Sequence, residues 1–185
     1  MNNCRCSWVT NDEIYQNYHD EEWGVPVYDD HTLYEMLILE SFHAGLSWLI
    51  ILKKRDNFRK AFDDFNSEKI EKYDDKKIIK LLNNEGIVRH KQKIMAAIEN
   101  TKIFHEIQKE FGSFSNYLWG FNNNKIIKNM DDNFQNRTAL SDKISKNLKS
   151  RGMKFVGSVT IQAYLEAIGI FNNHQLKCYL YKKQG

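Results

Sequence analysis

Apolar residues that recur every three or four positions constrain the fold of this 185-residue sequence more than any other feature. One such stretch predicts a helix with Leu33, Met36, Leu37, Glu40 and Ala44 on a single face. A β-sandwich or barrel needs many turns, and the chain has only one proline and nine glycines. The length suits one well-buried core. The sequence therefore predicts a single compact all-α unit over residues 1–185.

Three further stretches show helical spacing. We expect a helix around residues 94–101, one that begins with Ser141 as its N-cap, and one from about Ser158 to Ile168 that Gly169 ends. The residues expected to face inward are Ile94, Ala97, Ile98, Thr101, Ile144, Leu148, Ile161, Tyr164, Leu165 and Ile168. Those expected to face solvent are Lys143, Lys146 and Lys149. The Asn-rich residues 122–136 are expected to form a long loop.

Charge is unevenly distributed along the chain. Residues 1–40 hold nine acidic side chains and one basic one, whereas residues 141–185 hold eight basic and two acidic ones. This asymmetry permits a polyanionic partner on one side, and an ordinary lysine-rich surface explains it equally well. The longest apolar stretches, such as residues 46–52, are far too short to span a membrane, and the first residues lack the apolar core of a secretory signal. We expect a cytoplasmic monomer with no membrane partner.

Glu40 is anomalous because a carboxylate on an apolar helix face costs several kcal/mol unless it is paired or hydrogen-bonded. Such a group is often retained because it has a function, and the alternative is a buried glutamate satisfied by nearby polar groups. The aromatic residues near it in the sequence are Trp8, Tyr15, Tyr18, Trp23 and Trp48. Aromatic rings of this kind either form core or stack on a base extruded from duplex DNA.

Cysteine and histidine residues gather near the two chain ends as Cys6, His19, His174 and Cys178. His174 and Cys178 have the spacing that places two side chains on one side of a helical turn. Two thiolates and two imidazoles complete a tetrahedral zinc site and leave no position for catalytic water, so such a site would be structural. Cys4 could replace Cys6 in this set. The other interpretation is that these cysteines and histidines bind no metal.

Two glycine-bearing turns precede basic or amphipathic helices. Residues 149–160 predict a helix, a short hairpin and a second helix, and residues 85–94 predict another glycine turn that leads into a basic helix start. Backbone N–H groups in such turns can bind a phosphate. The residues expected to face DNA are Arg89, Lys91, Lys154 and Gly157. Connections like these also occur in helical proteins that bind no DNA.

Taken together, these stretches resemble the bacterial 3-methyladenine DNA glycosylase I family of the helix-hairpin-helix glycosylase superfamily. The resemblance runs nearly end to end and is strongest in Cys6–Val9, Tyr18–Pro26, Leu39–Glu40, Ala44–Trp48, Lys53–Arg55, Gly86–His90, Lys154–Gly157 and Gly169–His174 with Cys178. It implies a helix-hairpin-helix DNA glycosylase fold in which residues 1–30 and 170–185 form a zinc-clamped terminal subdomain.

The resemblance also implies the roles of individual residues. Glu40 would contact the methylated base, and the residues that line its pocket would be Tyr15, Tyr18, Trp8 and Trp48. One structural Zn²⁺ per chain would be bound by Cys6, His19, His174 and Cys178, because the family's cysteine motif aligns through Trp8 with Cys6 and not with Cys4. The implied partner is alkylated double-stranded DNA, and the implied product is free 3-methyladenine.

Two catalytic groups common in the superfamily are missing from their expected places. Residues 169–174 contain no acid where many of these enzymes carry a catalytic aspartate, and Val159 stands where a strand-cutting enzyme carries lysine. We therefore expect hydrolysis of the glycosidic bond without strand cleavage, with Glu40 as the group that selects the base. The competing interpretations are a glycosylase of wider alkylpurine range, a non-catalytic zinc-clamped DNA-binding module and, disfavoured by a fully ligated metal, a zinc hydrolase.

Overall fold

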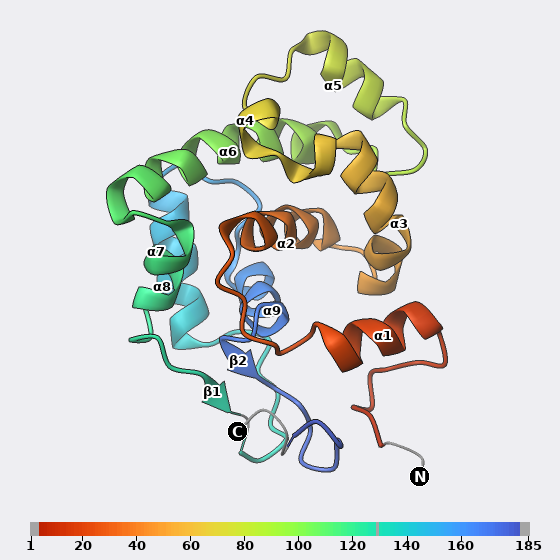
Figure 1. Ribbon diagram of the computed structural model, residues 1–185, viewed down its shortest axis with the longest axis vertical. Helices are drawn as coiled ribbons and strands as arrows, with labels where there is room; N and C mark the ends of the chain where they lie inside the picture. The colour runs from red at the N-terminus through yellow and green to blue at the C-terminus, as the bar shows by residue number, and fades with distance from the viewer. Residues whose placement is uncertain (1–3, 129, 182–185) are drawn as a thin grey trace.

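The computed structural model describes residues 4–128 and 130–181, and it confirms that the described chain is mainly helical (Figure 1). The α-helices are α1 (Glu13–Glu21), α2 (Asp30–His43), α3 (Trp48–Ala61), α4 (Ser67–Ile70), α5 (Asp75–Leu82), α6 (Lys91–Phe111), α7 (Phe114–Gly120), α8 (Ala139–Ser150) and α9 (Ser158–Ala167). A 3₁₀ turn, η1 (Asp63–Phe65), follows α3, and the short strands are β1 (Ile127–Lys128) and β2 (Phe171–Asn172). None of the described helices is long and apolar enough to cross a membrane.

Helix α2 lies at the centre of the molecule, where it contacts α3, α6, α7 and α9 (Figure 1). Every residue from Leu33 to Phe42 is buried, including Glu35 and Glu40. The positions from Leu33 to Glu40 that were expected on one face of this helix are buried, and the opposite face is buried as well because neighbouring helices cover α2 on all sides. Ala44 lies one residue beyond the helix as its C-cap.

The other expected helices are present, and one of them begins earlier than predicted. Helix α8 starts after Thr138, whose Oγ1 accepts a hydrogen bond from Ser141 N while Thr138 N donates to Ser141 Oγ. Ser141 is thus the second half of a capping box and not the N-cap. The ten residues expected to face inward are buried, and Lys143, Lys146 and Lys149 are exposed as predicted.

Gly169 ends α9 as predicted, and two observations explain why a glycine is needed there. Its φ of +75° lies in the left-handed region, and a Cβ at this position would lie 2.4 Å from the backbone carbon of Val25. The close approach allows Val27 N to donate to Ile168 O, which joins the chain before α2 to the end of α9.

The predicted loop at residues 122–136 contains a short strand that the sequence did not predict. Within it, β1 pairs in parallel with β2, with Ile127 opposite Phe171 and Lys128 opposite Asn172. Two residues are too few for a period-two pattern, so no sequence signal marks this strand.

The two ends of the described chain lie close together. Tyr179 N donates to Cys4 O over 2.9 Å, and Ser7 N donates to Gln175 Oε1 over 2.5 Å. The predicted terminal subdomain also includes residues 1–3 and 182–185, which lie outside the described residues.

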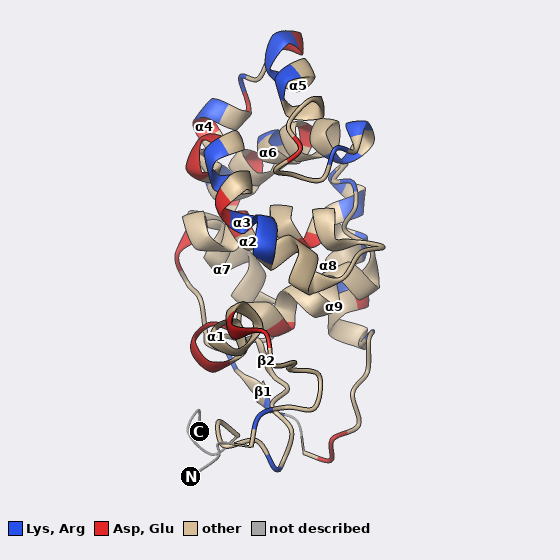
Figure 2. Ribbon diagram, turned by 90° about the vertical axis from the view of Figure 1, so that its right-hand side faces the viewer, with Lys and Arg blue, Asp and Glu red and all other residues tan. Residues whose placement is uncertain are grey.

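Acidic side chains of the N-terminal region are partly paired with basic side chains of α3. Figure 2 shows acidic residues on α1 and basic residues on α3 and α5. Lys53 and Arg55 of α3 form ion pairs with Asp12 and Glu22, which flank α1. The acidic N-terminal region is therefore neutralised in part by α3.

Candidate functional site

A cavity of about 190 Å³ lies where α1, α2, α3 and α9 meet. Its lining residues are Trp8, Tyr15, Tyr18, Trp23, Glu40, His43, Trp48, Ala163 and Glu166. The structure thus brings together all five residues that were expected to bind a base, although they come from four separate segments of the chain.

Glu40 lies in the wall of this cavity with only 3% of its surface exposed. Burial raises the pKa of its carboxyl group above the ordinary value, and a hydrogen bond with His43 acts in the opposite direction. His43 Nδ1 lies 2.9 Å from Glu40 Oε2. The histidine therefore favours the ionised carboxylate and fixes its orientation in the cavity.

Aromatic rings form much of the rest of the cavity wall. The ring of Trp8 lies 5.0 Å from that of Tyr15 and 4.9 Å from that of Trp23, and the ring of Tyr18 lies 5.5 Å from that of Trp48. The indole Nε1 of Trp48 is buried and has no hydrogen-bond partner among the described residues. An unsatisfied buried donor of this kind is costly.

The sequence singled out Trp23 only as one of the aromatic residues near Glu40, and it gave no role in this cavity to His43, Ala163 or Glu166. The three-residue spacing of Glu40 and His43 on one helix was a usable signal for the histidine. No comparable signal marked Glu166, because α9 lies far from α2 in the sequence. Gln162 and Asn173 both donate to Oε1 of Glu166, and burial raises the pKa of this carboxyl group to about 7.

A second cluster, at the chain ends, contains three of the four predicted metal ligands. The candidate ligand atoms of Cys6, His19 and Cys178 all lie within 4.8 Å of one another, and all three residues are buried. His19 Nε2 lies 3.5 Å from Cys178 Sγ, and His19 Nδ1 lies 2.8 Å from Asp20 Oδ1. A carboxylate on the far nitrogen is the usual partner of a metal-binding histidine.

His174, the fourth predicted ligand, is buried beside this cluster but is not one of the three residues within that distance. Its ring lies 5.0 Å from that of His19, and its Nδ1 lies 2.9 Å from Asn172 Oδ1. Its Nε2 is buried without a hydrogen-bond partner among the described residues. This unpaired nitrogen and the two thiols fit a Cys₂His₂ zinc site. Cys4 is exposed, which favours Cys6 as the ligand.

The two glycine turns that were expected to face DNA lie next to each other. Asn100 of α6 holds the hairpin between α8 and α9: its Nδ2 donates to Lys154 O, and its Oδ1 accepts from Lys154 N. At the start of α6, the ring of His90 lies 6.2 Å from that of Phe155. Lys93 Nζ donates to Phe42 O and Ala44 O, which connects this region to the end of α2.

The side chains predicted to bind phosphate are exposed, and two of them form ion pairs. Lys154 Nζ lies 2.5 Å from Glu99 Oε2, and Arg89 Nη1 lies 3.5 Å from Glu85 Oε1. Lys91 is exposed at the first position of α6. Gly157 is the N-cap of α9, and a Cβ there would meet no atom within 4 Å.

Known proteins resemble this chain over almost its whole length. DNA-3-methyladenine glycosylase of Haemophilus influenzae is 38% identical over 94% of this chain and 96% of that protein. DNA-3-methyladenine glycosylase 1 of Escherichia coli K12 is 37% identical over 96% of each chain. A crystal structure of 3-methyladenine DNA glycosylase I superposes with a TM-score of 0.92, with 38% identity over 95% of this chain and 98% of that one.

A structure from Staphylococcus aureus, described as the structural basis of 3-methyladenine recognition by 3-methyladenine DNA glycosylase I, superposes with a TM-score of 0.91. It is 38% identical and covers 95% of each chain. The methyladenine glycosylase family itself matches residues 8–181, which include the aromatic cavity, the hairpin and three of the four candidate metal ligands. The chain therefore belongs to the methyladenine glycosylase family.

Proposed function

We propose that this protein is a DNA repair glycosylase that excises 3-methyladenine from alkylated double-stranded DNA. The observation that carries the proposal is Glu40, a carboxylate 3% exposed in the wall of an aromatic cavity of about 190 Å³. An enzyme that acts on a base within duplex DNA must extrude the nucleotide into such a pocket. The family relationship and the activity named for relatives of 37–38% identity support the same substrate.

The cavity suits a flat, positively charged base. Trp8, Tyr15, Tyr18 and Trp48 offer ring faces and edges for stacking, which stabilises an extruded base. Methylation at N3 makes adenine in DNA cationic. The carboxylate of Glu40 accepts hydrogen bonds from the amino edge of adenine, and in a site of low polarity its charge favours a cation over neutral adenine.

The reaction replaces the bond between C1′ of the sugar and the base with a bond to water. The electron pair of the broken bond neutralises the methylated base, which leaves as free 3-methyladenine, and the water oxygen bonds to C1′ as its proton is released. Because the leaving base is already cationic, no strong acid is needed to protonate it. The pocket has to hold the extruded nucleotide and stabilise the positive charge that develops on the sugar.

A structural zinc ion would cross-link the chain ends through Cys6, His19, His174 and Cys178. The ring of Trp8 lies 5.3 Å from that of His19, and the ring of Trp23 lies 4.8 Å from that of His174. The proposed metal ligands therefore support two tryptophans of the base pocket. Four protein ligands leave the metal no position for substrate, so we assign it no part in bond cleavage.

The hairpin between α8 and α9 would hold the DNA backbone. Phosphates bind to backbone N–H groups at the start of α9 and to the cations Arg89, Lys91 and Lys154. The open space at Gly157 allows the DNA backbone to approach closely. Lys93 links this region to the end of α2. We propose that the protein acts in this way as a monomer in the cytoplasm.

Titration of the protein with free 3-methyladenine and with adenine distinguishes this function from that of a non-catalytic DNA-binding module. Tryptophan emission reports binding because Trp8, Trp23 and Trp48 line the cavity. We expect saturable binding of 3-methyladenine and far weaker binding of adenine. A protein that binds methylated DNA but neither free base would contradict the proposed pocket.

A further inference from the structure

The segment Lys53-Lys54-Arg55 of α3 lies outside the base pocket, but its first and last side chains contact both ends of α1. Lys53 Nζ lies 2.6 Å from Oδ2 of Asp12, the N-cap of α1, and Arg55 Nη1 lies 2.6 Å from Oε2 of Glu22, its C-cap. The Lys53 side chain is 51% exposed, whereas that of Arg55 is only 13% exposed. The partner carboxylates Asp12 and Glu22 are 24% and 45% exposed, so both ion pairs are partly open to solvent and Arg55 is the most buried of the four side chains.

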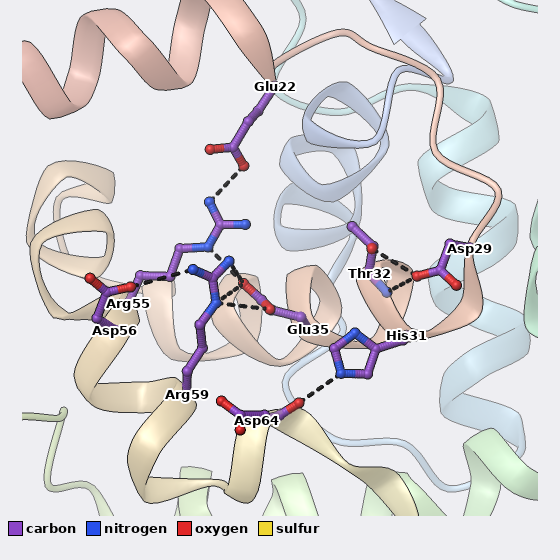
Figure 3. Close-up of polar contacts among 9 residues, drawn as sticks. All are labelled: Glu22, Asp29, His31, Thr32, Glu35, Arg55, Asp56, Arg59 and Asp64. Atoms are coloured by element: carbon purple, nitrogen blue, oxygen red, sulfur yellow. Dashed lines mark hydrogen bonds and ion pairs between the residues drawn. The ribbon is translucent and has the colours of Figure 1, made fainter.

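Arg55 also contacts α2, so one guanidinium group joins three helices. Its Nε donates to Glu35 Oε1 over 2.6 Å, and Glu35 is buried in the middle of α2 (Figure 3). Arg59 donates to the same carboxylate, with Nη2 2.8 Å from Oε1, and its other ion pair is with Asp56 of α3 itself. Because Arg59 can neutralise Glu35 without Arg55, the charge of Glu35 does not explain why two arginines are present. The ion pair with Glu22 is the contact that Arg55 makes and Arg59 does not.

The three helices that Arg55 joins are also three walls of the base pocket. Helix α1 carries Tyr15 and Tyr18, α2 carries Glu40, and α3 begins with Trp48. Glu22 lies one helical turn after Tyr18, and Arg55 lies about two turns after Trp48, so each ion-pairing residue shares a helix face with a pocket residue. The rings of Tyr18 and Trp48 lie 5.5 Å apart. The aromatic contact and the ion pair thus belong to one α1–α3 interface.

Electrostatics connects Arg55 to the same pocket wall. Burial raises the pKa of the Tyr18 hydroxyl, Glu40 and Glu22 raise it further, and Arg55 opposes them. The charges of Glu40 and Arg55 therefore both act on the Tyr18 hydroxyl.

We propose that Arg55 is a positioning residue that sets the spacing between the tyrosine wall of α1 and Glu40 of α2 by bonding Glu22 and Glu35 at once. This inference rests on the proposed function, because it concerns the pocket that binds 3-methyladenine. A small displacement of a binding group weakens binding even when every contacting residue is retained.

Two variants separate positioning from stability. Glu22→Gln removes the charge on α1 and leaves Arg55 bonded to Glu35, and the Glu22 side chain is 45% exposed, so folding should persist. Arg59→Gln removes a different arginine from Glu35 and leaves the connection to α1 intact. Free 3-methyladenine binding and thermal unfolding are measured on both variants and on the wild-type protein.

We expect Glu22→Gln to weaken 3-methyladenine binding about two- to fivefold with an unfolding midpoint close to that of the wild type. Arg59→Gln should lower the midpoint and keep wild-type affinity at a temperature where the protein is folded. Wild-type affinity in Glu22→Gln, or an equal loss of affinity in both variants, would overturn the positioning role. If the wild-type protein itself does not bind 3-methyladenine, the proposed function fails first, so the two failures are distinguishable.

Discussion

At the scale of single residues, the base pocket contains two carboxylates held in different ways. Glu40 is paired with His43, which stabilises its ionised form. Glu166 accepts two neutral amide hydrogen bonds, and burial raises its pKa to about 7. Burial thus raises the pKa of both carboxyl groups, and the rise is opposed by a histidine at Glu40 and by two amides at Glu166.

Glu40→Gln should weaken binding of free 3-methyladenine and slow excision. A neutral amide loses the charge attraction and presents a donor as well as an acceptor, so we expect a loss of about 1–3 kcal/mol. Binding titration and rates of base release from methylated DNA provide the measurements. If both remain at wild-type values, Glu40 serves only the packing of α2.

Glu166→Gln should remove a pH dependence of stability. The folded protein keeps the proton on Glu166 up to about pH 7, whereas the unfolded chain releases it near the ordinary pKa of 4.5. The contribution of Glu166 to the free energy of unfolding is therefore complete below about pH 4.5 and is lost as pH rises through 7.

Relative to the glutamine variant, the wild-type protein should lose on the order of 1–3 kcal/mol between these two pH values. Urea unfolding of both proteins from pH 4 to 8 measures the difference. Parallel stability curves would show that Glu166 titrates at its ordinary pKa.

Glu40 could be picked out as a candidate because its charge conflicts with the apolar positions around it, and the role expected for it came from the family resemblance. The place of Glu166 in the cavity could not be predicted, since the aromatic residues that line the cavity with it come from the other end of the chain. The same limit applies to Ala163, whose place in the cavity depends on how α1, α2, α3 and α9 converge.

At the scale of elements, the helical spacing predicted where helices form better than how they are buried. The apolar positions of α8 and α9 that were expected to face inward are buried, whereas α2 is buried on every side. A helix that is central in the fold contains polar residues that pair internally, and Glu35 with its two arginines is one such case (Figure 3). Those pairings depend on α3, which local periodicity does not place.

Gly157→Ala tests the hairpin as a DNA-binding element. The φ of −64° suits any residue, and a Cβ would meet nothing within 4 Å in the free protein. The unfolding free energy should therefore change by only about 0.5 kcal/mol in either direction. DNA affinity should fall, because the added methyl group would occupy the space into which we expect a DNA phosphate to fit.

Binding of a duplex oligonucleotide, compared with binding of free 3-methyladenine, measures this effect. Free-base binding should survive in Gly157→Ala. Unchanged affinity for DNA at several salt concentrations would show that the backbone does not approach this turn.

At the scale of the whole molecule, the chain ends are brought together beside the base pocket. Cys6 and His19 come from one end, and His174 and Cys178 from the other, so a metal bound there would close a loop over most of the chain. Cross-linking a long loop restricts the unfolded ensemble strongly, and metal affinity then becomes folding stability. The four Cys and His residues near the chain ends suggested this meeting from the sequence, and the family resemblance supported it, because no local pattern connects residues so far apart.

Cys178→Ser or His19→Ala should therefore reduce zinc from about one per chain to well below one and should lower the unfolding temperature. Cys4→Ser is the matched control, since Cys4 is exposed and should affect neither quantity. Elemental analysis and thermal unfolding provide the two readouts. Purified wild-type protein without stoichiometric zinc would show that the metal clamp is wrong.

The central claim concerns what the assembled molecule does to alkylated DNA. The direct measurement is chromatography of the bases released from duplex DNA treated with dimethyl sulfate, followed by analysis of strand integrity. We predict that the wild-type protein releases 3-methyladenine and leaves the DNA strand uncut at the resulting abasic site. Methylated DNA that is bound without release of free 3-methyladenine would contradict the account.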